Sequence, residues 1–218
     1  MSSRRKKHHY QLNMKIVVPG CIFTVLAFLL LGQTNLFEPA LREKQEMQVM
    51  GQAELTEDFL TPNPYSRPGI ELKKVRGIVI HYVGNAGTSA KENRDYFEGL
   101  KDNHERKASS HFIVGLEGEV IQCIPLSEIS YASNDRNADT ISIETCHPTE
   151  DGKFNKKTYQ ALVRLTGELC LRYNLSYKDV IRHYDVTGKQ CPLYFVDHKD
   201  KWKEFRHDVK KYMKGRRK

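Results

Sequence analysis

Residues 75–83 are the segment that most restricts the fold of this chain. Their sequence, Val-Arg-Gly-Ile-Val-Ile-His-Tyr-Val, places apolar side chains at both even and odd positions. A strand that is apolar on both faces belongs inside a sheet that is covered on both sides, which is the arrangement of α/β proteins. We therefore expect a central β-sheet flanked by helices.

His81 lies at the end of this strand, directly before a glycine-containing turn at residues 84–87. A lone histidine in such a position is more often a structural residue with satisfied hydrogen bonds. Ligand sites of open α/β sheets, however, collect where the strands end. His81 is therefore a candidate ligand.

A second segment, residues 182–192, gathers an imidazole, an ammonium and a thiol in the sequence RHYDVTGKQCP. Its glycine and its last proline exclude a continuous helix, so we expect a strand end that runs into a tight loop. Such a loop can direct His183 and Cys191 toward a common centre, with His81 as the third ligand. Three protein donors and an open fourth position are typical of a catalytic zinc site.

Residues 140–146 alternate cleanly, with isoleucines on one face and Ser142 and Glu144 on the other. A carboxylate in the middle of a strand is unusual. Glu144 can take a proton from an attacking water and pass it to a leaving amine. Lys189, two residues before Cys191, can stabilise the oxyanion of a tetrahedral intermediate, or it can steady the thiolate. Together these residues supply the roles that amide hydrolysis requires.

The remaining elements follow from similar patterns. We expect helices over residues 89–100, 155–173 and 199–213, a hairpin of residues 110–116 and 119–124, a polar loop at 131–139 and a short strand at 179–184. In the first helix Tyr96, Phe97 and Leu100 have the spacing of core residues.

The net charge of +8 is concentrated at the two ends of the chain. Residues 1–15 carry five basic side chains and residues 210–218 carry six, with no acid in either segment, so the remainder has a net charge of −3. A nucleic-acid-binding domain would spread its basic residues over one face. The distribution therefore argues against nucleic acid as a partner.

Residues 16–31 are uncharged, rich in Leu, Ile, Val and Phe, and directly follow the basic segment. Sixteen helical residues span about 24 Å of a hydrocarbon core of about 30 Å, and the residues up to 36 can complete the span. Residues 29–33, at the end of this segment, offer only Gly32 as a small residue for cleavage, so we favour an uncleaved signal anchor over a cleaved signal peptide. A buried helix of a soluble protein would show polar residues on one face.

The chain accordingly divides into a basic cytoplasmic segment (1–15), a transmembrane signal anchor (16–36), a stalk (37–60), a catalytic domain (61–213) and a basic tail (214–218). Cys123, Cys146 and Cys170 have apolar or amphipathic neighbours and are expected to be packed thiols. No regular spacing supports a disulfide framework, which leaves a single disulfide among the three open.

The sequence resembles the zinc-dependent N-acetylmuramoyl-L-alanine amidases of the type shared with phage lysins and peptidoglycan recognition proteins. The resemblance covers about residues 63–194. It is carried by four segments: GIVIHY at 77–82, SHFIV at 110–114, ISIE at 141–144 and HYDVTGKQCP at 183–192.

This resemblance implies a mixed sheet flanked by helices and a zinc ion held by His81, His183 and Cys191. It also implies that Glu144 is the acid/base residue, that Lys189 takes part in catalysis, and that the bond cleaved joins the lactyl group of muramic acid to L-alanine.

One position departs from part of the family. Several members have a catalytic tyrosine where this chain has Ser110, and the branch with serine relies on the glutamate, which implies a structural role for Ser110. We interpret the neighbouring His111 as a packing residue or as a partner of a ligand, rather than as a direct ligand.

Four further residues are candidates for substrate binding. Tyr65 and Arg67 lie in the proline-fixed segment 61–69, which either lines a groove or forms a surface strap that holds the first strand. Asn85 and Tyr131 lie in loops of the predicted domain.

These observations predict a monomeric, single-pass enzyme of the bacterial cell membrane whose catalytic domain faces the peptidoglycan outside. Two rivals stay open. One is a receptor that binds the stem peptide without cutting it, although such receptors in the resembling family lack the zinc cysteine. The other is a zinc peptidase that cuts within the stem peptide.

Overall fold

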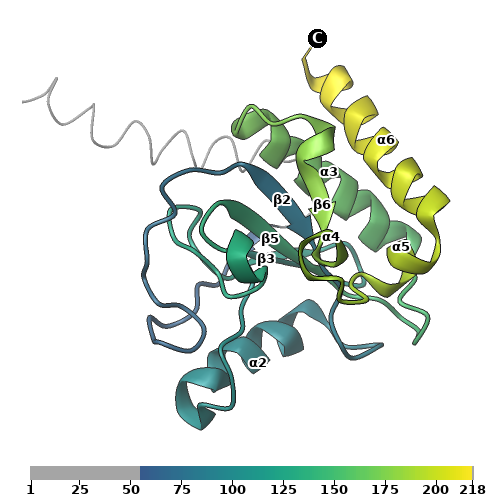
Figure 1. The fold of residues 1–218 in the computed structure, drawn as a ribbon. Coiled ribbons are helices and arrows are strands. Elements are labelled where there is room, and N and C mark those ends of the chain that lie inside the picture. Colours follow the sequence, from purple (N-terminus) through teal and green to yellow (C-terminus); the bar gives the residue numbers. More distant parts are fainter. Residues whose placement is uncertain (1–54, 218) are drawn as a thin grey trace, which may run out of the picture. The chain divides into compact units, whose positions relative to one another are not determined.

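The computed structural model describes residues 55–217, and a six-stranded sheet lies at the centre of this part of the chain (Figure 1). The strands are β1 (Leu55–Glu57), β2 (Gly77–Ile80), β3 (Phe112–Val114), β4 (Val120–Gln122), β5 (Thr140–Thr145) and β6 (Val180–Arg182). Their order is β1-β4-β3-β5-β2-β6, with β3 and β4 antiparallel and the other neighbours parallel. The predicted mixed sheet is confirmed.

Helices cover both faces of this sheet. They are α2 (Ala90–Asn103), α3 (Lys156–Arg172), α4 (His183–Thr187), α5 (Leu193–Asp197) and α6 (Lys199–Arg216), with short 3-10 turns η1 (Asn134–Arg136) and η2 (Tyr177–Asp179). Helices α3 and α6 pack on one another, and α3 contacts β2 and β3. Helix α2 lies apart from this pair in Figure 1 and contacts β3 and β4.

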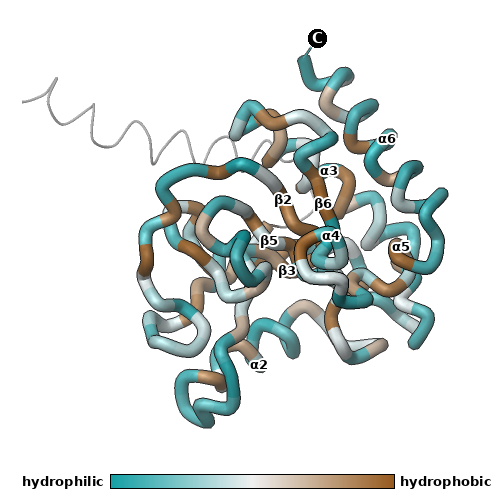
Figure 2. The backbone as a smooth tube through the Cα atoms, viewed as in Figure 1, coloured by the Kyte–Doolittle hydropathy of each residue, from teal (hydrophilic) through white to brown (hydrophobic). Residues whose placement is uncertain are grey.

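The strand β3 shows how the two faces are used. Phe112 and Val114 belong to the apolar cluster that includes residues of α3 and α6, whereas Ile113 belongs to the cluster that includes residues of α2. All four residues of β2 are buried as well. The hydropathy view in Figure 2 shows the same arrangement, with hydrophobic strands inside and a largely hydrophilic α6 outside. Residues 75–83 are therefore apolar on both faces because β2 lies inside a sheet that is covered on both sides, as predicted.

Helix α2 begins where the sequence indicates. Ser89 and Glu92 form a reciprocal capping box, and Phe97 and Leu100 are buried. Tyr96 is 42% exposed, so its predicted core position is wrong. The inner face instead follows the helical spacing from Ala90 through Arg94, whose guanidinium donates to the carbonyl groups of residues 58 and 59.

The sheet includes residues that the sequence assigned to the stalk. Strand β1 pairs with β4, and Leu60 is fully buried, so the folded domain includes residue 55 and the predicted boundary at residue 61 is too late. At the other end α6 continues to Arg216, beyond the predicted end of the domain. The four cysteines of the described region, Cys123, Cys146, Cys170 and Cys191, are all free and buried.

The predicted basic segment (1–15) and signal anchor (16–36) lie outside the described residues. Between residues 55 and 217, no helix is both long enough and apolar enough to cross a bilayer.

Candidate metal centre and active site

The candidate site lies at the carboxyl ends of three adjacent parallel strands. In the sheet register Ile80 of β2 pairs with Ile143 of β5 on one side and with Arg182 of β6 on the other. The next residue on each strand is a predicted site residue, namely Glu144, His81 and His183. The amide of His81 also donates to the Ile143 carbonyl at 2.8 Å, which extends the ladder to this point. Parallel pairing thus brings together residues that are far apart in sequence.

Cys191 reaches the same place through a turn. The segment after β6 forms the five-residue helix α4 rather than the tight loop that was predicted. Gly188 ends this helix with a φ of 78°, a left-handed conformation that glycine adopts at little cost. The chain then folds back, and the amide of Tyr184 donates to the Cys191 carbonyl at 2.9 Å. A glycine and a proline exclude a long helix but permit a single short one.

Arg182 and Asp185 hold the start of this turn. The Asp185 carboxylate accepts from the Arg182 amide at 2.9 Å and from its guanidinium at 2.6 Å. The guanidinium also donates to the Phe195 carbonyl at 2.9 Å. The start of the segment that carries His183 is therefore tied to α5.

His81, His183 and Cys191 are buried, and their donor atoms all lie within 4.8 Å of one another. Cys191 Sγ is 3.8 Å from His81 Nδ1, and the two imidazole centroids are 4.7 Å apart. A tetrahedral zinc ion with its usual bond lengths places such donors about 3.3–3.7 Å apart, so the observed set is slightly wider. Nδ1 of His183 is buried without a hydrogen-bond partner, as expected for an atom reserved for a ligand.

The electrostatics of these three residues fit a cation. Burial lowers the pKa of His81 well below its usual value, with the charges of His183 and Lys189 acting in the same direction. Burial and Lys189 also lower the pKa of His183, so both imidazoles are neutral and able to donate a lone pair. Burial raises the pKa of the Cys191 thiol to about 12, and Glu144 adds to this shift. A thiolate at this depth therefore needs a positive partner.

Glu144 lies beside the three donors. Its Oε1 is 3.9 Å from His81 Nδ1, and its buried Oε2 has no hydrogen-bond partner. The side chain is 17% exposed, and burial raises its pKa to about 8 while the charge of Lys189 opposes that shift. A carboxyl with a pKa near neutrality is suited to both accepting and donating a proton.

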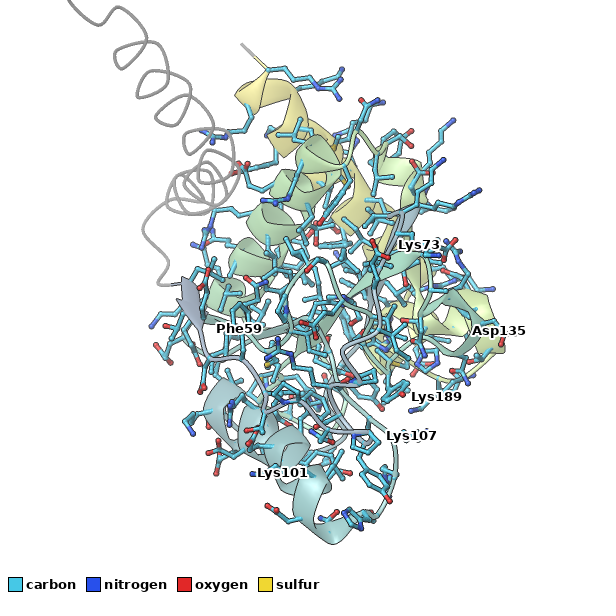
Figure 3. All side chains as sticks on the ribbon, turned by 90° about the vertical axis from the view of Figure 1, so that its left-hand side faces the viewer. Phe59, Lys73, Lys101, Lys107, Asp135 and Lys189 are labelled. Carbon is cyan, nitrogen blue, oxygen red and sulfur yellow. The ribbon has the colours of Figure 1, made fainter. Side chains whose placement is uncertain are left out.

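Lys189 is exposed on the loop between α4 and Cys191, and Figure 3 shows it at the same edge of the domain as Asp135. Its positive charge lowers the pKa values of His81, His183, Glu144 and Cys191. An influence on all four groups fits an ammonium that faces the centre, and it leaves open whether the charge serves an oxyanion or the thiolate.

Two residues that the sequence did not single out contact the histidines. Ser133 Oγ is 3.1 Å from Nε2 of His81, and Asn134 Oδ1 is 3.0 Å from Nε2 of His183. Both belong to the predicted polar loop 131–139, part of which forms η1. Serine and asparagine are ordinary loop residues, so no pattern in the sequence distinguishes them.

The predicted substrate-binding residues have varied surroundings. Arg67 makes a bidentate ion pair with Glu128 and donates to the Leu60 carbonyl, which is the strap role rather than a free groove position. Tyr65 stacks on His104 with centroids 4.3 Å apart. Asn85 is exposed in the turn after β2, and Tyr131 is partly buried with Lys107 over its ring.

Ser110 and His111 belong to a buried polar network. Ser110 donates to the Phe112 carbonyl at 3.0 Å, while His111 Nδ1 accepts from the Ser142 amide at 3.1 Å. His111 Nε2 lies 2.9 Å from the Glu128 carbonyl, so both ring nitrogens are already engaged. This arrangement fits the packing interpretation of His111.

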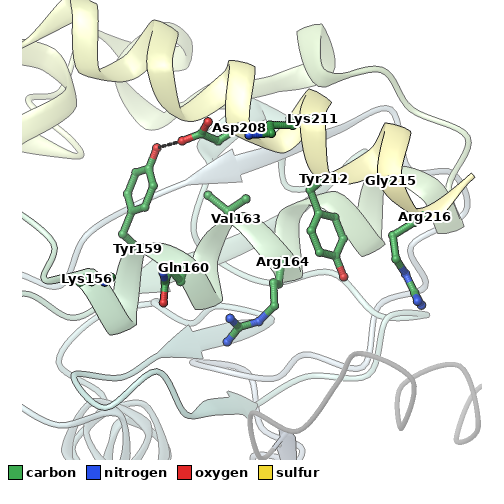
Figure 4. Close-up of a pocket in the computed structure, with 10 residues that line it drawn as sticks. All are labelled: Lys156, Tyr159, Gln160, Val163, Arg164, Asp208, Lys211, Tyr212, Gly215 and Arg216. Carbon is green, nitrogen blue, oxygen red and sulfur yellow. Dashed lines mark hydrogen bonds between the residues drawn. The ribbon is translucent and has the colours of Figure 1, made fainter.

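A hollow lies between α3 and α6, away from these residues (Figure 4). Its volume is ≈ 720 Å³, and Tyr159 donates to Asp208 at its edge at 2.7 Å. Its lining residues are Lys156, Tyr159, Gln160, Val163, Arg164, Asp208, Lys211, Tyr212, Gly215 and Arg216. None of the predicted catalytic or metal-binding residues lines this hollow.

Comparisons with known proteins identify the family of this domain. Residues 71–193 match the model of the family described as N-acetylmuramoyl-L-alanine amidase. The chain is 38% identical over 168 residues to the N-acetylmuramoyl-L-alanine amidase CwlL of Bacillus licheniformis, which covers 71% of this chain and 46% of that protein. It is 32% identical over 182 residues to the N-acetylmuramoyl-L-alanine amidase BlyA of Bacillus subtilis (strain 168), and this match covers 74% of this chain and 48% of BlyA. The chain thus spans about half the length of these curated relatives.

Solved structures show the same fold. The catalytic domain of XlyA superposes with a TM-score of 0.61 at 25% identity, covering 72% of this chain and 99% of that chain. The catalytic domain of PlyG gives a TM-score of 0.62 at 25% identity, and the match covers 73% of this chain and 95% of the PlyG chain. The matched family segment contains His81, Glu144, His183, Lys189 and Cys191. The fold, the strand-end site and the family match together establish that this chain belongs to the N-acetylmuramoyl-L-alanine amidase family.

Proposed function

We propose that this chain is a zinc-dependent amidase that hydrolyses the bond between the lactyl group of N-acetylmuramic acid and L-alanine in peptidoglycan. The observation that carries the proposal is the convergence of His81, His183 and Cys191, with Glu144 beside them, at one end of the sheet. Membership of the amidase family supports the choice of substrate.

The ligand assignment follows from the donor set. Two neutral imidazoles and one thiolate leave a net positive centre when zinc is bound, and zinc there supplies Lewis acidity toward the amide carbonyl and the attacking water. The unpartnered Nδ1 of His183 supports this assignment.

Glu144 and Lys189 perform the remaining steps. Glu144 takes a proton from the water that adds to the lactyl carbonyl carbon, and the Lys189 ammonium stabilises the negative oxygen that results. Glu144 then gives the proton to the nitrogen of L-alanine as the C–N bond breaks. The products are a free lactyl carboxylate and a stem peptide with a free amino terminus.

The decisive variant is Glu144→Gln, which keeps the size and polarity of the side chain but removes the base. We expect zinc content to stay at the wild-type level and hydrolysis of muropeptides to fall by about 10²- to 10⁴-fold. Metal analysis and mass spectrometry of digests measure the two effects. Glu117→Gln, in the exposed turn between β3 and β4, is the matched control and should leave both unchanged.

Each rival function has its own outcome in this experiment. A wild-type protein without zinc and without cleavage would favour a peptidoglycan receptor. Products cut inside the stem peptide would identify a zinc peptidase. Wild-type activity in Glu144→Gln would remove Glu144 from the mechanism.

The cellular setting is part of the same proposal. We place the domain outside the bacterial cytoplasmic membrane, tethered by the apolar segment of residues 16–36, and we propose that it acts as a monomer. Basic residues before an apolar segment favour this orientation, and the proposed substrate lies on the side to which the anchor would deliver the domain.

A further inference from the structure

One short loop contacts both histidines of the candidate centre. Ser133 and Asn134 are consecutive, and each lies within hydrogen-bond distance of the outer nitrogen, Nε2, of a different imidazole. We name residues 132–137 the histidine clip. The clip lies between β4 and β5 in the chain, apart from the strands that lead to His81 and His183.

The clip selects one protonation form of His183. The Oδ1 atom of Asn134 can only accept a hydrogen bond, so Nε2 of His183 carries the proton and donates it. The lone pair of a neutral imidazole then resides on Nδ1, which is the buried atom without a partner. Ser133 Oγ can accept from Nε2 of His81 in the same way, and Nδ1 of His81 is the atom that faces Cys191 Sγ.

The clip is held in place by contacts within the protein. Asn137 Oδ1 accepts from the amides of Ala132 and Ser133 at 3.1 and 2.6 Å. Asn134 has a φ of 51°, a left-handed conformation that is uncommon outside glycine and is tolerated by asparagine. Helix α4, which begins with His183, contacts η1 directly. Strained residues of this kind persist where the surrounding structure fixes them.

We propose that Ser133 and Asn134 are positioning residues that fix the tautomer and orientation of both histidines and thereby set the affinity of the centre for zinc. This inference rests on the proposed metal site. Partners of metal-bound histidines typically change metal affinity by about 10- to 100-fold when they are removed. Ser133 is almost fully buried whereas Asn134 is exposed, so water can replace the amide of Asn134 but not the hydroxyl of Ser133. The effect at Ser133 is therefore the larger one.

The test measures zinc affinity of the full chain by competition with a chelator. We expect Ser133→Ala to weaken zinc binding by about 10- to 100-fold and Asn134→Gly by less. Glycine suits the left-handed backbone at residue 134, so this variant removes the amide without adding strain. Ser133→Thr and Asn134→Asp keep an acceptor oxygen and should restore most of the affinity.

The matched control is Asn174→Gly. Asn174 is also exposed and has a φ of 52°, but it lies in the turn after α3. We expect the Asn174→Gly protein to bind zinc with the same affinity as the wild type. Thermal unfolding of the metal-free proteins separates positioning from stability, because a purely structural role would lower the unfolding temperature of the clip variants without a specific loss of zinc.

A second measurement needs no variant. Nitrogen NMR of the metal-free wild-type protein distinguishes the two neutral tautomers of each histidine, and we expect the Nε2–H form for both His81 and His183. A predominant Nδ1–H form, or unchanged zinc affinity in Ser133→Ala, would overturn the role of the clip while leaving the amidase proposal intact. A wild-type protein that neither binds zinc nor cleaves muropeptides would overturn both.

Discussion

Cys191 is the residue on which the proposed chemistry depends most strongly. Its thiol is buried, and burial raises its pKa to about 12, so the thiol carries a proton at neutral pH. Binding of a cation must therefore displace this proton, which links metal affinity to pH. The backbone amide of Tyr82 and the charge of Lys189 both favour the thiolate and reduce that cost.

Substitution of Cys191 tests its role directly. We expect Cys191→Ala to lose bound zinc and activity, because two neutral imidazoles alone form a weak site. Cys191→Asp supplies an anionic oxygen in place of the thiolate, and it should retain part of the zinc and part of the activity. Zinc content per protein and muropeptide hydrolysis are the measurements.

The control for this pair is Cys170→Ala, which removes a buried free thiol of α3. We expect it to lower stability but to keep zinc at the wild-type level. Retention of full zinc content by Cys191→Ala would show that Cys191 is not a ligand.

Local context explains which residues could be predicted from the sequence. His81, His183 and Cys191 stand out because two short segments place metal-binding side chains next to turn residues. Tyr96 and Phe97 are adjacent aromatics, and only packing decides which of them faces inward; the structure buries Phe97. Ser133 and Asn134 carry no periodic or chemical signature, since their function arises from contacts with residues about 50 positions away.

At the scale of elements, short segments were the hardest to predict. Strand β1 has only three residues and lies in a polar segment, so it can be recognised only from its pairing with β4 in the structure. The five-residue helix α4 is shorter than any reliable periodic pattern. The longer helices α3 and α6 are predictable because each repeats an apolar spacing over many residues. Strand β2 is predictable because its segment is apolar on both faces, and β5 because its residues alternate between apolar and polar.

Helix α2 is joined to the segment after β1 by Glu98, whose contacts make a pH-dependent contribution to stability. Burial tends to raise the pKa of Glu98, but hydrogen bonds from Thr61 and Lys101 outweigh it and lower the pKa to about 2. The Thr61 hydroxyl donates at 2.6 Å and Lys101 at 2.9 Å. Because the folded-state pKa lies below the ordinary 4.5, this stabilisation is present above pH 4.5 and is lost as the pH falls toward 2.

We therefore expect Glu98→Gln to reduce the free energy of unfolding at pH 7 by about 1 kcal/mol, a modest value because the group is partly solvated. The difference from the wild type should shrink between pH 4.5 and 2. Denaturant unfolding across this range measures it. Glu105→Gln, at an exposed pair with Arg106, should show neither effect. A difference that stays constant with pH would exclude the ionisation of Glu98 as its cause.

For the whole molecule, the main prediction concerns the N-terminal segment. We expect the protein to keep its apolar segment and to remain in the membrane fraction, because residues 29–33, where that segment ends, offer only Gly32 as a small residue for cleavage. Protease added outside intact cells should digest the catalytic domain. N-terminal sequencing that begins after Gly32, or release of the protein into the medium, would contradict the anchor.

The position of β6 has a consequence for the synthesis of this protein. Among the described residues, β6 is the last strand along the chain and one of the two edge strands of the sheet, and it leads directly to His183 and Cys191. A nascent chain that has emerged only as far as β5 contains His81 and Glu144 but lacks two of the three proposed ligands. On the proposed mechanism, hydrolytic activity appears only when translation has passed residue 191, so chains that terminate before Cys191 are inert toward the cell wall.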